Sequence, residues 1–138
     1  MKKFLALLLT AMLALGCFSL TASAEIADFD PELVAAAQAE GELIVYGSCE
    51  EMYLSAACAQ FEKEFGIKVS KQRLSSGEVQ AKITAENGNP SADVWFGGTT
   101  DPYNIVAGLN LLEAYEAKNA VHITKSNFRD ADGYWYGI

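Results

Sequence analysis

Hydroxyl-bearing residues and glycines follow three runs of the chain that each predict a β-strand. Each group lies where the strand passes into a helix, so free backbone N–H groups and the positive end of the helix dipole are available to an anion. Serine and threonine hydroxyls add hydrogen-bond donors, and glycine lets the backbone approach a ligand closely. These residue types predict a binding site for a small polar or anionic ligand. The candidate ligand-binding residues are Ser48, Cys49 and Glu50, then Ser75, Ser76 and Gly77, and then Gly98, Thr99 and Thr100.

Each of these groups also has an ordinary structural interpretation. Ser75 or Ser76, and Thr100 or Asp101, are residue types that commonly cap helix N-termini. The occurrence of three such groups on one predicted sheet edge favours ligand binding. The phosphate-loop pattern GxxxxGK[ST] and the dinucleotide pattern GxGxxG are both absent from the sequence, which leaves nucleotide binding without support.

Residue patterns typical of catalysis are sparse. His122 is the only histidine, and it lies in a weakly patterned stretch. Cys49 stands at a predicted helix start, where a thiol can be activated as a nucleophile, but the spacing assigns no base to it. The sequence has neither a Cys-x-x-Cys motif nor a His pair, the spacings typical of metal sites. We therefore expect a protein that is not an enzyme and has no metal ligand or cofactor. An exported α/β hydrolase using Cys49 or Ser48 is the alternative.

The elements that must position these residues alternate between strand and helix. Such alternation predicts an α/β fold, a three-layer, mostly parallel, doubly wound sheet with right-handed crossovers. The carboxyl ends of its strands then share one edge, where ligands bind in such folds. Predicted strands cover 41–48, 67–74 and 92–97, and a further strand begins at 134–138. A first helix is predicted to start at 30–31, and further helices to cover 51–65, 75–86 and 100–108. One more helical piece is expected from 111, and a turn at 130–133.

The first 24 residues predict a signal peptide. Lys2 and Lys3 are followed by the apolar run 4–15 and by the small-residue cleavage pattern 22–24. Residues 13–17 are similar to a bacterial lipobox, so acylation of Cys17 is the alternative to cleavage after Ala24. The sequence thus predicts an exported protein, periplasmic or extracellular, whose domain begins at residue 25.

The net charge limits the classes of binding partner, and the cysteine positions bear on whether a disulfide bond can form. Removing Lys2 and Lys3 with the leader leaves 8 basic and 18 acidic residues, a net charge of −10. This charge argues against nucleic acid and anionic membranes as partners, although local N–H groups can still bind a small anion.

Cys49 and Cys58 are expected to stay unbonded, because a strand end and the second turn of the next helix lie more than about 7 Å apart. Cys58 fits an apolar stripe and is expected in the core.

Taken together, several segments resemble the extracellular solute-binding proteins of bacterial ABC importers, in the group that holds ferric-ion-binding and phosphonate-binding members. The resemblance implies the type II periplasmic-binding fold, with two α/β lobes and the ligand between them. Residues 25–138 would then form a partial N-terminal lobe of a truncated chain. The matching segments are GELIVYGS (41–48), FEKEFGIKV (61–69), SSGEVQAKI (75–83), NPSADVWFGGTTD (89–101), GLNLLEAYEAKNA (108–120) and DGYWYGI (132–138).

The resemblance also implies a function and ligand contacts. A monomeric protein would capture a solute and deliver it to the membrane subunits of an ABC permease, with contacts at 48–50, 76–77 and 98–99. Ferric-binding members place a histidine near the first segment and a glutamate near the last, where this chain has Glu50 and Gly98. An organic anion such as a phosphonate or phosphate ester is therefore favoured over iron, which stays the alternative. A complete small domain that pairs through an exposed sheet edge is a third possibility.

Overall fold

The computed structural model describes residues 29–137, and the predicted leader with Cys17 lies outside this range, as does Ile138. No helix in the described range is long and apolar enough to cross a membrane. The helices are α2 (Pro31–Glu40), α3 (Glu51–Phe65), α4 (Ser76–Glu86) and α5 (Thr100–Gly108), and the strands are β1 (Glu42–Gly47), β2 (Lys68–Arg73) and β3 (Val94–Phe96). Two short 3-10 helices follow, Lys118–His122 and Ser126–Phe128.

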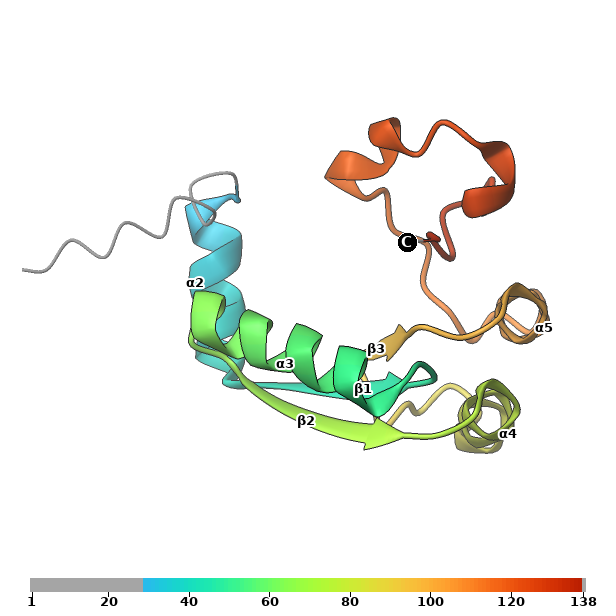
Figure 1. The fold of residues 1–138 in the computed structure, drawn as a ribbon, viewed down its shortest axis with the longest axis horizontal. Coiled ribbons are helices and arrows are strands. Elements are labelled where there is room, and N and C mark those ends of the chain that lie inside the picture. The colour runs from blue at the N-terminus through green and yellow to red at the C-terminus, as the bar shows by residue number, and fades with distance from the viewer. Residues whose placement is uncertain (1–28, 138) are drawn as a thin grey trace, which may run out of the picture.

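The three strands form one parallel sheet in the order β2-β1-β3, as the alternation predicts (Figure 1). The central strand β1 carries the apolar run, and the charged strand β2 lies at an edge, which agrees with the sequence interpretation. The register pairs Gly47 with Arg73 on one side and with Phe96 on the other. The carboxyl ends of all three strands therefore lie side by side.

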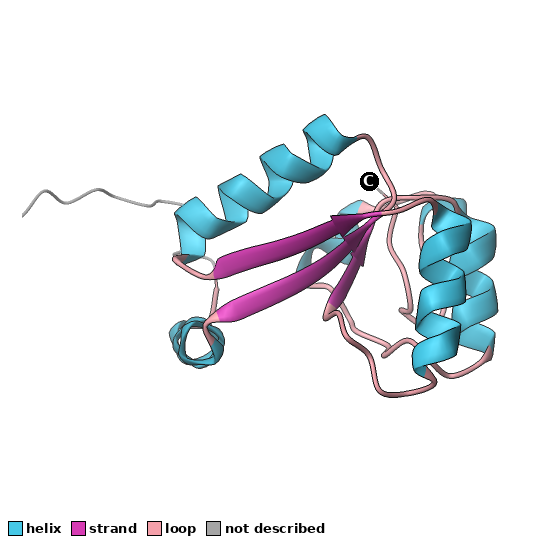
Figure 2. Cartoon of the chain, turned by 90° about the horizontal axis from the view of Figure 1, so that it is seen from below, coloured by secondary structure: helices cyan, strands magenta, loops and turns pink. Residues whose placement is uncertain are grey.

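Helices cover both faces of the sheet. Tyr46 of β1 is buried with Val79 of α4 and Val106 of α5, while its neighbour Gly47 faces the side chain of Leu54 in α3. Because successive strand residues face opposite sides, α3 packs on one face and the α4–α5 pair on the other. Figure 2 shows α3 running alongside the strands and α4 next to α5. Coverage at the amino end of β1 is incomplete, because Ile44 is 36% exposed.

Tyr46 also anchors the end of α4. Its hydroxyl donates to a carboxylate oxygen of Glu86 over 2.7 Å, and the ring lies under the ammonium group of Lys82. Glu86 accepts a second hydrogen bond from the backbone N–H of Ser91 at 3.2 Å. Burial opposes ionisation of Glu86, but these bonds outweigh it and hold the pKa of the carboxyl below its usual range. The contacts tie the central strand to the turn that leads into β3.

Two predictions for the C-terminal part of the described range are wrong. The helical piece expected from residue 111 is absent, and the strand expected at 134–138 is only an isolated antiparallel bridge between Arg129 and Tyr136. The backbone N–H of Tyr115 instead donates to the carbonyl of Gly133 at 3.1 Å, so this segment bonds to the returning chain rather than to itself. The turn predicted at 130–133 is present, because the Asp130 carboxylate accepts from two backbone N–H groups just after it.

Both described cysteines are free thiols, as expected. Cys58 is only half-buried, so its assignment to the core was too strong; α3 buries Leu54 alone completely. Burial still raises the pKa of the Cys58 thiol. Cys49, also half-buried, lies at the carboxyl end of β1 with the other candidate site residues.

Candidate functional site

The three predicted segments meet at the carboxyl edge of the sheet. We call residues 48–50, 75–77 and 97–100 the rim. The backbone N–H of Ser48 donates to the carbonyl of Phe96 at 2.9 Å, which carries the strand pairing into the rim. Across it, the backbone N–H of Thr99 donates to the hydroxyl of Ser76 at 3.3 Å. The first and third segments, and the second and third, are therefore in direct contact.

Two consecutive glycines permit this approach. Gly97 and Gly98 have φ angles of 76° and 113°, in the range that favours glycine. A Cβ on Gly98 would lie 2.7 Å from the hydroxyl oxygen of Ser76 and 3.1 Å from the Cβ of Ser48. A Cβ on Gly97 would lie 2.8 Å from that of Cys49. Any larger residue would push the three segments apart.

Two serine hydroxyls of the rim have the same hydrogen-bonding polarity. Ser48 Oγ accepts from the indole Nε1–H of Trp95 at 2.8 Å, and Ser76 Oγ accepts from the backbone N–H of Thr99. An indole N–H and an amide N–H can only donate, so each serine still has its own O–H to offer. The rim therefore presents donors to an incoming group, which suits a ligand rich in acceptor oxygens.

Three helices begin at the rim and add backbone donors. Glu50 and Thr99 precede α3 and α5, and neither caps its helix with a side chain. In α4, Ser75 and Glu78 form a capping box, which leaves the first N–H groups of that helix, on Ser76 and Gly77, without intrahelical partners. The helix starts thus concentrate positive partial charge near the serine hydroxyls.

The nine predicted residues do not play equal parts. Gly98 lies against both Ser48 and Ser76, and Thr99 bonds to Ser76, whereas the hydroxyl of Ser75 caps α4 by accepting from the backbone N–H of Glu78 at 3.3 Å. The Ser75 hydrogen bonds, followed by the weaker effect of the Arg73 charge, lower the pKa of the Glu78 carboxyl. Gly77 contributes its N–H to the start of α4, Cys49 contacts the Gly97 position, and Glu50 and Thr100 are exposed at the starts of α3 and α5.

The structure adds three residues that the sequence interpretation did not select. Arg73, the last residue of β2, donates from Nε to the carbonyl of Cys49 at 3.2 Å. Trp95 bonds to Ser48, and Tyr103 of α5 stacks on the Trp95 ring with centroids 3.9 Å apart. The strand-end position of Arg73 is a signal that could have identified it. The indole bond could not be predicted, because it depends on the side-chain rotamers of two strands.

Tyr103 stabilises the backbone of the third rim segment through hydrogen bonds. Its hydroxyl donates to the carbonyl oxygens of Gly97 at 2.7 Å and Trp95 at 3.1 Å. Burial raises the pKa of Tyr103 well above its usual range, so the phenol stays neutral and keeps its proton for these bonds. The role of Tyr103 is to fix the backbone that carries the two glycines.

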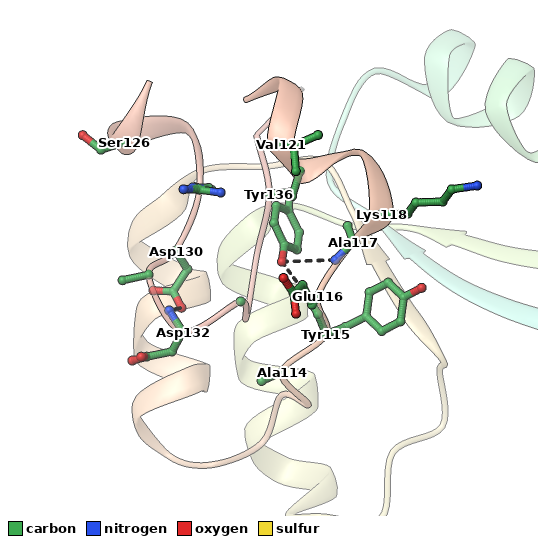
Figure 3. Close-up of a pocket in the computed structure, with 14 residues that line it drawn as sticks. Ala114, Tyr115, Glu116, Ala117, Lys118, Val121, Ser126, Asp130, Asp132 and Tyr136 are labelled. Atoms are coloured by element: carbon green, nitrogen blue, oxygen red, sulfur yellow. Dashed lines mark hydrogen bonds between the residues drawn. The ribbon is translucent and has the colours of Figure 1, made fainter. Parts of the chain in front are cut away.

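One pocket borders the rim, and a larger one lies beyond it. A pocket of about 450 Å³ borders the third rim segment, and its lining includes the aromatic residues Trp95, Tyr103 and 134–136. A larger pocket of about 820 Å³ lies between residues 114–121 and 126–136 and includes no rim residue (Figure 3). There the Tyr136 hydroxyl donates to the carbonyl of Tyr115 at 2.6 Å (Figure 3). The convergent donors favour the rim as the ligand site.

The contacts of the rim give no support for an activated serine nucleophile or for a metal site among the described residues. Ser48 faces an indole N–H, which cannot take up a proton, so the contact does not activate the hydroxyl as a nucleophile. Among residues 29–137, no group of three or more His, Cys, Asp or Glu side chains is placed to hold a metal ion. The arrangement is suited to binding an anion through hydrogen bonds.

Comparison with known proteins places the fold. No family model matches the chain. An uncharacterised protein of Haemophilus influenzae is 40% identical over 94 residues, which are 68% of this chain and 27% of that protein. The periplasmic binding protein AfuA from Actinobacillus pleuropneumoniae, solved with fructose-6-phosphate bound, is 39% identical with a TM-score of 0.62, over 68% of this chain and 30% of AfuA.

A more distant likeness supports the same fold. Iron-bound HitA from Pseudomonas aeruginosa has a TM-score of 0.65 at 24% identity, over 70% of this chain and 31% of HitA. The chain thus spans about a third or less of the length of each of these three proteins. The described residues therefore contain a partial α/β lobe with the fold of these periplasmic binding proteins.

Proposed function

We propose that this chain belongs to the solute-binding component of an ABC importer and captures a small organic phosphate ester. The observation that carries the proposal is the convergence of two serine hydroxyls, Ser48 and Ser76, with their protons free to donate. The 39% identity to AfuA, whose structure holds fructose-6-phosphate, supports a phosphate ester as the ligand class.

The phosphate group would be held by hydrogen bonds at the rim. Its oxygens would accept from the hydroxyls of Ser48 and Ser76 and from the first N–H groups of α4 and α5. Gly98 lets these groups approach to one point, and Arg73 adds a positive charge beside the first segment. The local donors oppose the net charge of the chain, since short-range hydrogen bonds outweigh screened distant charges.

A ferric ion is the less favoured ligand. Iron sites use anionic oxygen and nitrogen ligands, whereas the contacts at this rim leave mainly hydroxyl and backbone N–H donors. Glu50 is exposed, and Gly98 supplies no side chain at the position where ferric-binding members have a glutamate. The identity to HitA is too low to transfer its ligand.

The remaining parts of the proposal concern delivery. An exported protein, with the leader at residues 1–24 removed, would enclose the ligand between this lobe and a second one by a hinge motion and present it to the permease. We propose a monomeric, non-enzymatic protein in the periplasm or outside the cell. Acylation of Cys17 is the alternative mode of retention.

Calorimetric titration of the full-length gene product tests this function. We expect fructose 6-phosphate to bind and fructose to bind about 100-fold more weakly or worse, because two charge-assisted hydrogen bonds contribute about 3 kcal/mol. Inorganic phosphate and ferric citrate serve as the comparison ligands. Binding of iron without binding of any phosphate ester would show that the proposed ligand class is wrong.

Adjacent serines give a matched pair of variants. Ser75→Ala removes the cap of α4 and is expected to lower the free energy of unfolding by about 1 kcal/mol while changing affinity little. Ser76→Ala removes a proposed ligand contact and is expected to weaken fructose 6-phosphate binding about tenfold with little change in stability. Urea denaturation and calorimetry measure the two effects. Equal affinity of the two variants would remove Ser76 from the site.

A further inference from the structure

We propose that Trp95 is a positioning residue that sets the direction of the Ser48 hydroxyl and so makes Ser48 a donor to the ligand. The inference rests on the proposed function, because it assigns a role within the same phosphate site. Trp95 lies on β3, and its indole Nε1–H donates to Ser48 Oγ at 2.8 Å. No sequence motif identifies this contact, since the two residues are 47 positions apart.

The indole is held firmly enough to orient a partner. The Trp95 ring stacks on Tyr103 with an interplanar angle of 23°, and the Tyr103 hydroxyl donates to the carbonyl of Trp95 itself. Trp95 also packs against the buried cluster around Tyr46 and Val79. Because both the ring face and the backbone of Trp95 are held by Tyr103, the direction of the indole N–H is fixed.

The chemistry of the indole fixes the polarity of the contact. An indole N–H has no lone pair to offer, so the serine oxygen must act as the acceptor in this pair. The serine proton is then directed elsewhere, and a phosphate oxygen, which only accepts at its ionised positions, is a suitable partner. Without the indole, the Ser48 hydroxyl would rotate among its rotamers and lose this preorganisation.

A double-mutant cycle tests the role in the full-length gene product. Trp95→Phe keeps an aromatic ring over Tyr103 but removes the N–H, and Ser48→Ala removes the hydroxyl. We expect each single variant to bind fructose 6-phosphate about tenfold more weakly than wild type, and the double variant to bind no more weakly than Ser48→Ala. A residue that only stabilises the fold would not show this coupling, so the cycle separates positioning from general support.

The outcomes distinguish this inference from the proposed function. If wild type binds no phosphate ester, both are wrong. If wild type binds but Trp95→Phe binds equally well, or if the two single losses multiply to about 100-fold in the double variant, only the role of Trp95 is wrong. The titrations are read together with the circular dichroism of each variant, which reports whether it is folded.

A second measurement decides the matter if Trp95→Phe does not fold. The indole N–H resonance of Trp95 can be assigned in wild type from its through-space contacts with the ring of Tyr103, on which the Trp95 ring stacks. We expect Ser48→Ala to shift this resonance and to speed its hydrogen exchange by about tenfold, and saturating fructose 6-phosphate to shift it in wild type. An indole signal that responds to neither change would overturn the proposal.

Discussion

Replacement of Gly98 by alanine is expected to lower the affinity for fructose 6-phosphate by about 100-fold or more. A Cβ at this position would lie 2.7 Å from Ser76 Oγ and 3.1 Å from Ser48 Cβ, closer than side-chain atoms ordinarily approach a Cβ. Both proposed hydroxyl ligands would have to move, and two charge-assisted hydrogen bonds are worth about 3 kcal/mol together. Calorimetric titration of the full-length gene product measures the change.

Gly66 provides the matched control. It also has a positive φ, 69°, but a Cβ there would meet nothing within 4 Å. Gly66→Ala should therefore carry the backbone strain alone, a loss of about 1 kcal/mol of stability with unchanged affinity. If Gly98→Ala retained wild-type affinity, or if Gly66→Ala lost as much affinity as Gly98→Ala, close approach of the three segments would not be what makes the site.

Strong local signals explain why the elements up to residue 108 could be predicted. The Asp30-Pro31 start, the continuous apolar run of β1 and the stop at Gly66 each depend on neighbouring residues, and all three are found as expected. The meeting of the rim segments follows from parallel pairing, because pairing partners of Gly47 place the strand ends together. Strand β3 is shorter than predicted, three residues at Val94–Phe96.

Predictions failed where distant contacts decide the conformation. Leu111 and Leu112 pack partly buried against the core cluster, and their segment forms no helix although its sequence favours one. The Trp135 indole donates to the side chain of Asn104 at 2.8 Å instead of aligning a predicted strand with the sheet. Trp95 and Tyr103 were missed for the same reason, since their roles depend on contacts between strand and helix.

The rim depends on the core directly beneath its first segment. Gly47 ends β1 and leaves space that the side chain of Leu54 fills, since a Cβ on Gly47 would lie 2.3 Å from a Leu54 methyl group. Ser48 follows immediately, so the packing of α3 on β1 determines where the first hydroxyl of the rim lies. Stability and the proposed ligand binding are therefore linked through this one contact.

Leu54→Ala is accordingly expected to lower the free energy of unfolding by about 3 kcal/mol or more. Leu54 is 0% exposed, and truncation of a fully buried leucine removes its burial energy and leaves a cavity. That loss is a large share of the free energy of unfolding of an ordinary domain. The variant should therefore have a lower melting temperature, and it should bind ligand more weakly at temperatures close to that midpoint. Leu33→Ala on α2, where the side chain is 59% exposed, should change stability by less than about 0.5 kcal/mol. Urea denaturation of both variants in the full-length gene product measures the difference, and equal midpoints would show that Leu54 does not support the sheet beneath the rim.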